Sequence, residues 1–283
     1  MRADLMSSLA LAVILAAACQ TEADTSAAMT STATPAAPAQ PAPPAAPARP
    51  AAPAATTTTA ASAHISAAVA DAARPQADKD LDAARKPADM MAFAEVQPGD
   101  KVGELIPGGG YMTRVLAKSV GPTGKVYLLS GPPRQAGAAQ PFQGILDDKT
   151  NYPNVSFVQT DFVTLTAPEP LDLVWTSQNY HDLHNPGRNV DIAAANKAVF
   201  NALKPGGVYV VLDHSSKAGV DFDAQLHRID AQKVKNEVLA AGFEFIGESD
   251  VLRNPADPRD KAVFDPSIRR KTDQFILKFR KPG

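Results

Sequence analysis

Short apolar runs alternate with segments of helical spacing throughout residues 63–283. Short runs rich in Val, Ile, Leu and Phe predict strands, and apolar residues three or four apart predict helices. The expected strands are 101–106, 125–129, 155–160, 171–176, 208–212, 243–246 and 274–279, and the expected helices are 81–96, 111–120, 189–203 and 231–241. This alternation predicts an α/β fold, a doubly wound and mostly parallel sheet.

Two details refine this pattern. Pro87 falls inside the first expected helix and must interrupt or restart it. The last two strands have no segment of clean helical periodicity between them, so we expect them to form an antiparallel pair.

The first residues differ from the rest of the chain. Arg2 precedes an apolar stretch, 5–18, that ends in three alanines before Cys19, which is the pattern of a secretory signal. A lone cysteine directly after small residues resembles the lipobox of bacterial lipoproteins, in which the cysteine receives the lipid. We therefore expect a signal peptide at 1–18 and an exported protein, anchored by lipid on the periplasmic side of a bacterial membrane. Ordinary cleavage after the alanines is the alternative and would give a soluble periplasmic protein.

Residues 19–62 consist mostly of Ala, Pro and Thr. They offer no large apolar side chains for a core, and their prolines deny them a continuous helix. We expect a disordered, extended linker there, followed by one folded domain at 63–283.

Charge and cysteine content exclude several classes of function. The chain has 28 Lys and Arg against 30 Asp and Glu, a formal charge of −2, which argues against nucleic acid as a partner. A single cysteine excludes an intramolecular disulfide and a cysteine-based zinc site. Contact with a membrane is expected only through the N-terminal lipid.

A run of three glycines follows the first strand and opens the next helix. Such a loop lets a ligand approach the backbone, and the helix N-terminus offers free N–H groups. As a dinucleotide fingerprint, G-x-G-x-x-G, the third glycine would fall on Thr113, and the second strand ends in Ser130 rather than an acid. Both features argue against NAD. The alternative pattern, E-x-G-x-G-x-G, begins at Glu104 and matches except at Ile106.

With this loop the sequence resembles the class I S-adenosylmethionine-dependent methyltransferases. Residues 110–127 are similar to the corresponding part of protein isoaspartate methyltransferases, and 72–283 resemble a group of bacterial exported "predicted methyltransferases". The shared segments of that group are 85–87, 105–111, 180–184, 213–214, 227–230 and 272–275.

The resemblance implies a Rossmann-like, seven-stranded sheet and S-adenosylmethionine as cofactor. It places Glu104, Gly108 and Gly110 under the methionine end of the cofactor, and Asp161 with Phe162 at the adenine. Ile106 replaces the first glycine of the family's loop, and Ser130 replaces the acid that holds the ribose. The cofactor-binding residues that we carry over are Glu104, Gly108, Gly109, Gly110, Ser130, Asp161, Phe162 and Asn179.

Three histidines follow the fourth and fifth strands, where a substrate would lie in such a fold. His181, His184 and His214 are candidates for the general base that takes a proton from the methyl acceptor. No metal site is assigned, although His181 and His184 with Asp213 or His214 form an alternative set of ligands. Arg85 and Arg228 could anchor a carboxylate or phosphate of the substrate, with a surface role favoured for each.

The expected function is methyl transfer from S-adenosylmethionine to a small-molecule acceptor. A rival hypothesis is a cell-envelope protein that reuses the fold to bind a small ligand without catalysis, since the cofactor is made in the cytosol. Binding of S-adenosylmethionine distinguishes the two, because fold alone does not settle function.

The lipid anchor predicts a simple fractionation result. Cys19→Ser should prevent labelling by a fatty-acid analogue and move the protein from the membrane fraction to the soluble fraction, because the substituted residue cannot form the thioether. A wild-type protein without label, or a variant that stays with the membrane, would contradict the anchor.

Overall fold

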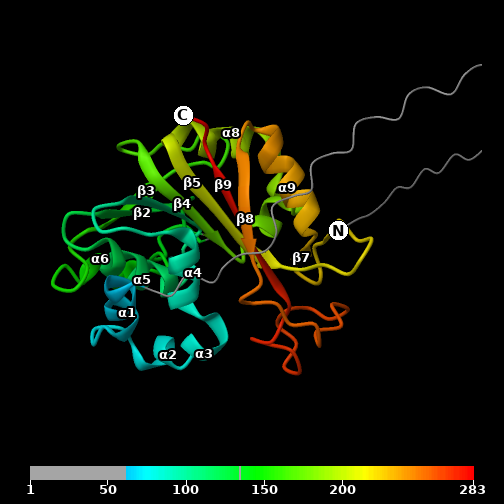
Figure 1. Cartoon of the computed structure of the whole chain (residues 1–283), viewed down its shortest axis with the longest axis horizontal. Coiled ribbons are helices and arrows are strands. Elements are labelled where there is room, and N and C mark those ends of the chain that lie inside the picture. The colour runs from blue at the N-terminus through cyan, green and yellow to red at the C-terminus, as the bar shows by residue number, and fades with distance from the viewer. Residues whose placement is uncertain (1–61, 134) are drawn as a thin grey trace, which may run out of the picture. The chain divides into compact units, whose positions relative to one another are not determined.

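A seven-stranded sheet organises the residues that the computed structural model describes, 62–133 and 135–283 (Figure 1). The strand order is β3-β2-β1-β4-β5-β9-β8, and only β9 runs antiparallel, to both of its neighbours. The strands of the sheet are β1 (Lys101–Leu105), β2 (Lys125–Ser130), β3 (Val155–Gln159), β4 (Leu171–Ser177), β5 (Leu203–His214), β8 (Glu244–Ser249) and β9 (Gln274–Arg280). The predicted fold class and the antiparallel final pair are confirmed.

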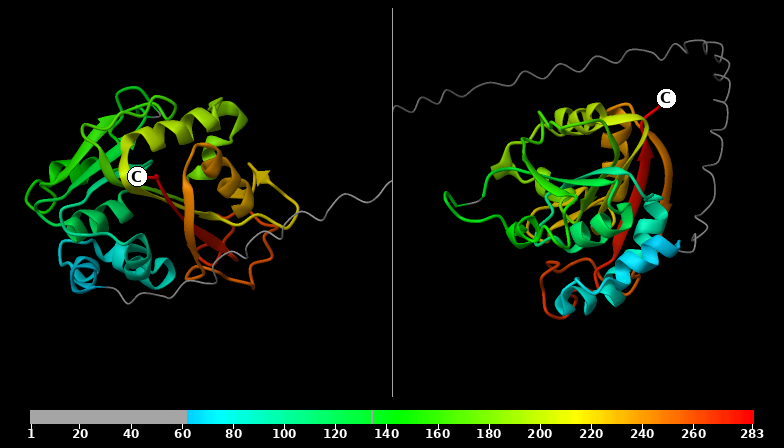
Figure 2. Two further views of the ribbon diagram at one scale, coloured as in Figure 1. Left: turned by 45° about the horizontal axis from the view of Figure 1, so that its top comes forward. Right: turned by 90° about the vertical axis from the view of Figure 1, so that its left-hand side faces the viewer.

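Helices cover both faces of this sheet (Figures 1 and 2). The helices are α1 (Ala63–Ala70), α2 (Gln76–Lys79), α3 (Asp82–Arg85), α4 (Pro87–Ala94), α5 (Tyr111–Val120), α6 (Gln143–Asp147), α7 (Tyr180–Leu183), the 3₁₀ turn η1 (Pro186–Arg188), α8 (Ile192–Ala202) and α9 (Ala231–Ala240). A short hairpin, β6 (Phe222–Asp223) with β7 (Arg228–Ile229), precedes α9.

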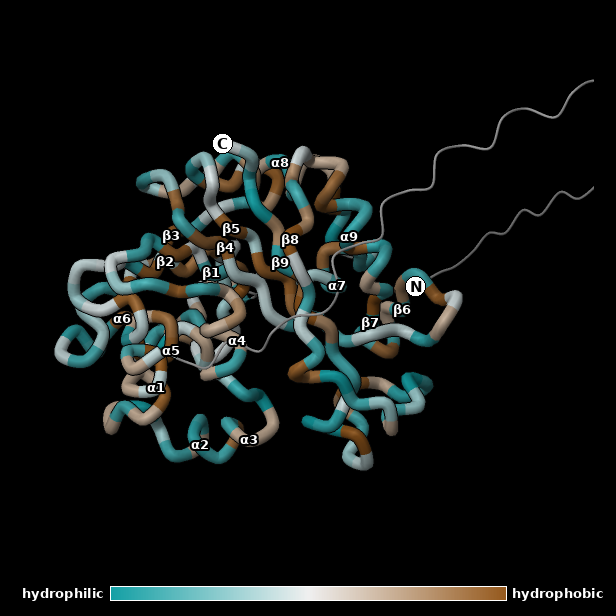
Figure 3. The backbone as a smooth tube through the Cα atoms, in the orientation of Figure 1, coloured by the Kyte–Doolittle hydropathy of each residue, from teal (hydrophilic) through white to brown (hydrophobic). Residues whose placement is uncertain are grey.

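Alternate strand residues divide the core into two clusters. Trp175 of β4 packs in one cluster with residues of α1, α4, α5 and α6, and its neighbour Val174 packs in the other with α7, α8 and α9. Successive side chains of a strand point to opposite faces, so a strand covered on both sides must be apolar at successive positions. In Figure 3, brown marks hydrophobic residues and is concentrated along the strands.

Local side chains explain where two helices differ from their expected limits. The helix expected at 81–96 is divided, since Lys86 adopts a φ of 46° and Pro87 begins α4. The helix expected from 189 begins at Ile192, because the Asp191 carboxylate caps it by accepting the N–H of Ala194 at 3.0 Å.

Several elements were not predicted, namely α1, α2, α6, α7 and the β6–β7 hairpin. Each is short, so its apolar periodicity is weak in the sequence. The signal peptide, Cys19 and nearly all of the linker at 19–62 lie outside the described residues. Within 62–133 and 135–283, none of the helices combines the length and the apolar character required to cross a bilayer.

Candidate functional site

The loop between β1 and α5 leaves the sheet in a left-handed backbone conformation. φ is 50° at Ile106, 57° at Gly108 and 78° at Gly110. Glycine adopts this region freely, whereas a β-branched residue is rare there. Ile106 stands where the expected loop has its first glycine, so the backbone keeps the glycine conformation although the side chain differs.

Asn179 holds this loop against the end of β4. Its Nδ2 donates to the carbonyl of Ile106 at 2.9 Å and to that of Ser177 at 2.7 Å. The N–H of Ile106 donates to the carbonyl of Leu129 at 3.0 Å. The loop is therefore tied to the ends of both strands beside β1.

Glu104 is a buried acid beneath the glycines, with 3% of its surface exposed. The hydroxyl of Thr113 donates to its Oε2 at 2.5 Å. Burial raises the pKa of Glu104 to about 8, and the hydrogen bond opposes this only in part. The group is therefore largely protonated at neutral pH, and a cationic ligand group beside it would favour the carboxylate.

A cavity of about 340 Å³, which we call the glycine-loop cavity, opens at the carboxyl ends of β1 and β4. It brings together Glu104, Gly108, Gly109 and Asn179, four of the predicted cofactor residues. A Cβ added at either glycine would meet no atom within 4 Å, so the space above the loop is free for a ligand. The remaining lining residues are Asp78, Leu81, Arg85, Leu105, Ile106, Pro107, Tyr111, Met112, Ser177 and Gln178.

Gly110 is not among the residues that line this cavity. A Cβ there would stand 2.1 Å from Cδ1 of Ile145, so the start of α5 packs closely on α6. Gly110 therefore shapes the loop through packing, and Gly108 and Gly109 are the glycines that face the cavity.

The predicted adenine residues lie in a second cavity, of about 510 Å³, at the carboxyl ends of β2 and β3. We call it the strand-edge cavity. Asp161 and Phe162 line it, and Gly131 lines it directly after Ser130. Ser130 itself ends β2, and its carbonyl accepts the N–H of Thr160 at 3.0 Å. The structure thus places six of the eight predicted cofactor residues in two cavities on the same edge of the sheet, and Gly110 and Ser130 line neither.

A third cavity, of about 280 Å³, adjoins the glycine-loop cavity and shares Leu81, Arg85 and Gln178 with it. We call it the arginine cavity. The residues that line it besides these three are Ala84, His214, Val263, Phe264, Arg269, Arg270, Thr272 and Gln274. A molecule in this cavity would lie next to the contents of the glycine-loop cavity.

Three arginines and no carboxylate line the arginine cavity. Among the described residues, no hydrogen bond or ion pair involves the guanidinium of Arg85, Arg269 or Arg270, and that of Arg85 lies 4.6 Å from the centre of the Tyr111 ring. Burial lowers the pKa of Arg85, Tyr111 and Asp78 oppose this effect, and the charge of Arg270 adds to it. Three guanidinium groups that no carboxylate binds directly favour an anionic ligand in this cavity.

The three candidate histidines have different surroundings. His214 lines the arginine cavity, and its Nδ1 lies 2.9 Å from Oγ1 of Thr272. Burial lowers the pKa of His214 to about 4, so its imidazole is neutral at physiological pH.

His181 lies behind His214 and is buried, with 6.3 Å between the two ring centres. Its Nδ1 lies 2.7 Å from Oδ1 of Asp213, and its N–H donates to Oδ2 at 2.8 Å. Burial opposes the charged imidazole, but Asp213 outweighs this effect and raises the pKa of His181. The same pairing holds the pKa of Asp213 low despite its own burial.

His184 points away from the cavities, toward α9. Its Nε2 lies 3.1 Å from Oε2 of Glu237, which also accepts the hydroxyl of Tyr180 at 2.9 Å. One turn of α7 therefore sends His181 and His184 to different neighbours, and the structure brings His181 and His214 together without His184.

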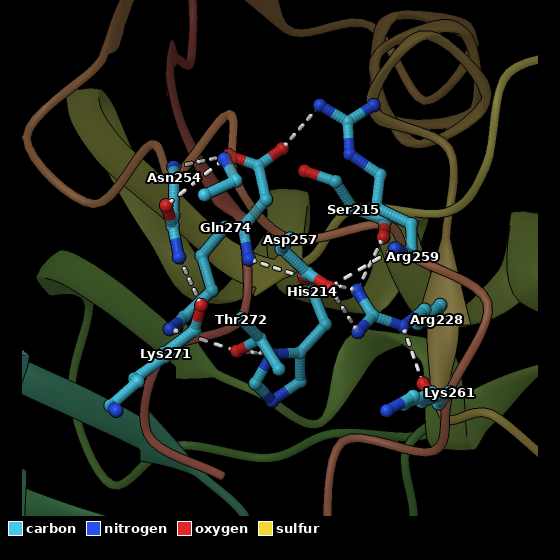
Figure 4. A network of polar contacts seen from close by, with 12 residues as sticks. His214, Ser215, Arg228, Asn254, Asp257, Arg259, Lys261, Lys271, Thr272 and Gln274 are labelled. Atoms are coloured by element: carbon cyan, nitrogen blue, oxygen red, sulfur yellow. Dashed lines mark hydrogen bonds and ion pairs between the residues drawn. The ribbon is translucent and has the colours of Figure 1, made fainter. Parts of the chain in front are cut away.

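Arg228 is fully buried rather than on the surface. Its Nη1 donates to Asp257 Oδ2 at 2.9 Å and to the carbonyl of Ser215 at 2.9 Å (Figure 4). The surface role favoured for Arg228 is wrong, and these bonds engage the guanidinium in holding the segment before β9. Arg85 lines two cavities, so the less favoured alternative, an anchor for an anion, stays a prediction for this residue.

Sequence reasoning missed Arg269, Arg270 and Gln178 as lining residues. The two arginines belong to the irregular segment before β9, where no periodicity indicates a neighbour. Their place next to the segment 272–275, which carries part of the resemblance, was the available signal.

No family model matches the chain. Among curated proteins, the ubiquinone/menaquinone biosynthesis C-methyltransferase UbiE of Hydrogenovibrio crunogenus is 30% identical over 193 residues, which cover 66% of each chain. The chain spans about half to two thirds of the length of the curated relatives it matches, from 46% to 66%.

Solved structures of other proteins share this fold, among them the following two. A methyltransferase from Aquifex aeolicus that depends on S-adenosylmethionine has a TM-score of 0.52 at 17% identity, covering 74% of this chain and 98% of its own. The cyclase SpnF has a TM-score of 0.53 at 18% identity, covering 73% and 81%. At such identities the similarity concerns the fold alone. The same fold occurs in a protein that is named a cyclase.

The raised pKa of Glu104 predicts how stability depends on pH. Between about pH 5 and pH 8 the unfolded chain ionises Glu104 and the ligand-free folded chain does not, so this group lowers the free energy of unfolding as pH rises, by up to about 4 kcal/mol. In urea titrations Glu104→Gln should therefore gain stability relative to wild type with rising pH.

The exposed acid Glu244 on β8 provides the control for this experiment. Glu244→Gln should follow the wild-type pH dependence throughout the range. A constant stability difference between Glu104→Gln and wild type from pH 5 to pH 8 would show that Glu104 is ionised in the folded protein.

Proposed function

Because the chain belongs to the class I S-adenosylmethionine-dependent methyltransferase superfamily, we propose that it transfers the methyl group of this cofactor to a small anionic acceptor. The observation that carries the proposal is that Leu81, Arg85 and Gln178 line both the glycine-loop cavity and the arginine cavity, so the two cavities adjoin. A cofactor bound along the glycine loop and an acceptor held by the arginines would lie next to each other where the cavities meet. Export and a lipid anchor at Cys19 remain part of the proposal and rest on the sequence alone.

The residues present fit the cofactor. The free space above Gly108 and Gly109 admits a ligand against the backbone, and the protonated acid Glu104 can ionise beside an ammonium group. Asp161 and Phe162 offer a carboxylate and an aromatic ring in the strand-edge cavity, which suits adenine. When bound, S-adenosylmethionine supplies an electrophilic methyl group.

The acceptor would be bound by charge and by shape. Arg85, Arg269 and Arg270 present guanidinium groups that can pair with a carboxylate or phosphate, and the cavity of about 280 Å³ limits the acceptor to a small molecule. Methyl transfer requires mainly that the nucleophile be held in line, so this anchoring is the chain's chief contribution to the rate.

His214 is the residue that we assign to proton removal. In the tautomer whose Nδ1–H donates to Oγ1 of Thr272, Nε2 carries a lone pair and can accept the proton of the acceptor's nucleophile. Burial keeps the imidazole neutral near pH 7, so its lone pair is free, and the same low pKa makes it a weaker base than an ordinary histidine.

Cofactor binding gives the first test of this function. The purified protein should bind S-adenosylmethionine in calorimetry, and Gly108→Val should abolish binding, because the new side chain fills the space above the loop in a strained conformation. Binding near pH 7 should release protons as Glu104 ionises. The binding enthalpy measured in buffers of different ionisation enthalpy gives the number of protons released.

Gly219→Val is the matched control for that test. Gly219 has a φ of 79° and equally free surroundings, yet it lies outside the lining of the three cavities, so its variant should bind the cofactor normally. The absence of heat at millimolar cofactor would favour the non-enzymatic binding protein.

Two variants of the arginine cavity separate anchoring from chemistry. Candidate acceptors are screened in pairs with methyl-labelled cofactor. One member of each pair carries a carboxylate and the other the corresponding amide, and more label should be transferred to the carboxylate. Arg85→Gln should raise KM for the carboxylate about 10- to 100-fold through loss of a charged hydrogen bond. His214→Ala should lower kcat about 10²- to 10⁴-fold and leave cofactor affinity intact.

His184→Ala is the control, because the structure directs this imidazole to Glu237. It should retain the wild-type kcat. An equal loss of kcat in His184→Ala and His214→Ala would contradict the assigned base, and equal transfer to both members of each acceptor pair would contradict an anionic acceptor.

A further inference from the structure

Two imidazoles and a carboxylate meet beside the arginine cavity. His181 and Asp182 belong to α7, and His227 directly precedes β7. One ligand atom from each of the three residues lies within 4.8 Å of the other two. Nε2 of His181 is 3.3 Å from Nδ1 of His227 and 3.7 Å from Oδ1 of Asp182.

A carboxylate orients the ring of His181 through its Nδ1, as is usual for histidines that bind metal through Nε2. The carboxylate of Asp213 can only accept hydrogen bonds, so Nδ1 of His181, 2.7 Å away, must carry the hydrogen. Nε2 of the neutral ring then carries the lone pair, and it faces His227 and Asp182. A buried carboxylate that orients the far side of an imidazole is the usual outer partner of a metal-binding histidine.

The separations also fit one coordination sphere. Zinc–nitrogen bonds of about 2.0–2.1 Å in a tetrahedral site place neighbouring ligand atoms about 3.4 Å apart. The 3.3 Å between the two ring nitrogens agrees with this value and is long for a hydrogen bond. On its other side Asp182 has Arg188, whose Nη2 is 3.6 Å from Oδ2, which leaves Oδ1 toward the histidines.

We propose that His181, Asp182 and His227 bind a divalent transition metal ion of the Zn²⁺ type through Nε2, Oδ1 and Nδ1. The set differs from the alternative considered from sequence, since His184 is bonded to Glu237 and His227 takes its place. Three protein ligands leave a fourth position for water or a substrate atom, as in catalytic zinc sites.

The site borders the arginine cavity through two side chains of its lining. The ring of His227 lies 4.9 Å from that of Phe264, and the ring of His181 lies 6.3 Å from that of His214. A metal ion here would add positive charge next to the three arginines and favour a deprotonated acceptor atom. Metal binding itself does not depend on the proposed methyl transfer.

Cobalt provides the test, because tetrahedral Co²⁺ absorbs visible light. The full chain, without an affinity tag and stripped of metal, should bind one equivalent of Co²⁺ with this absorption, and Zn²⁺ should displace it. His227→Ala and Asp182→Asn remove partly exposed ligands, and each should weaken binding at least 10-fold while circular dichroism stays that of wild type. Zn²⁺ should raise the Tm of wild type and not that of His227→Ala.

His184→Ala is the matched control, an imidazole from the same turn bonded to Glu237, and it should bind Co²⁺ as wild type does. Absence of the absorption, or equal Co²⁺ affinity in wild type, His227→Ala and Asp182→Asn, would overturn the site. All measurements are made without S-adenosylmethionine, so their failure is separate from failure of cofactor binding.

Discussion

The fully buried carboxylate of Asp213 is the constraint on which the candidate site depends. A charge in the core must be compensated by hydrogen bonds. This carboxylate accepts hydrogen bonds from the backbone N–H groups of His181 and His214 and from the ring Nδ1–H of His181. These bonds join the end of β5 to α7, the short helix that follows β4 in the chain. They fix the ring of His181 toward His227 and hold the backbone of His214 beside the arginine cavity, where the imidazole of His214 contacts Thr272.

Much of the fold could be predicted because it rests on local signals. The limits of α5 agree with its apolar spacing between two glycine turns, and Pro87 divides its helix as its chemistry requires. Glu104 with Gly108 and Gly109 could be placed together because a strand, a loop and a helix in direct succession leave little freedom. In these places the conformation is decided by residues close in sequence.

The rest of the site is decided by contacts between distant residues. The directions of His181 and His184 follow from Asp213 and Glu237, which lie tens of residues away, and no spacing reveals them. Arg269 and Arg270 reach their cavity because Arg228, with Asp257, anchors the irregular segment between β8 and β9. A buried ion pair of this kind stabilises one arrangement only when both partners are present, since either charge alone would be unpaired in the core.

The place of β9 has a consequence for how the chain acquires this shape. β9 is the last strand of the sheet in chain order, yet it lies between β5 and β8. Until residues 274–280 arrive, β5 and β8 each present an unpaired edge, and the polar groups along those edges can pair with other chains. The pairing of β5 and β8 with β9 can therefore form only late in synthesis, and a chain stopped before β9 would leave these two strands unpaired on that side and the arginine cavity without Gln274.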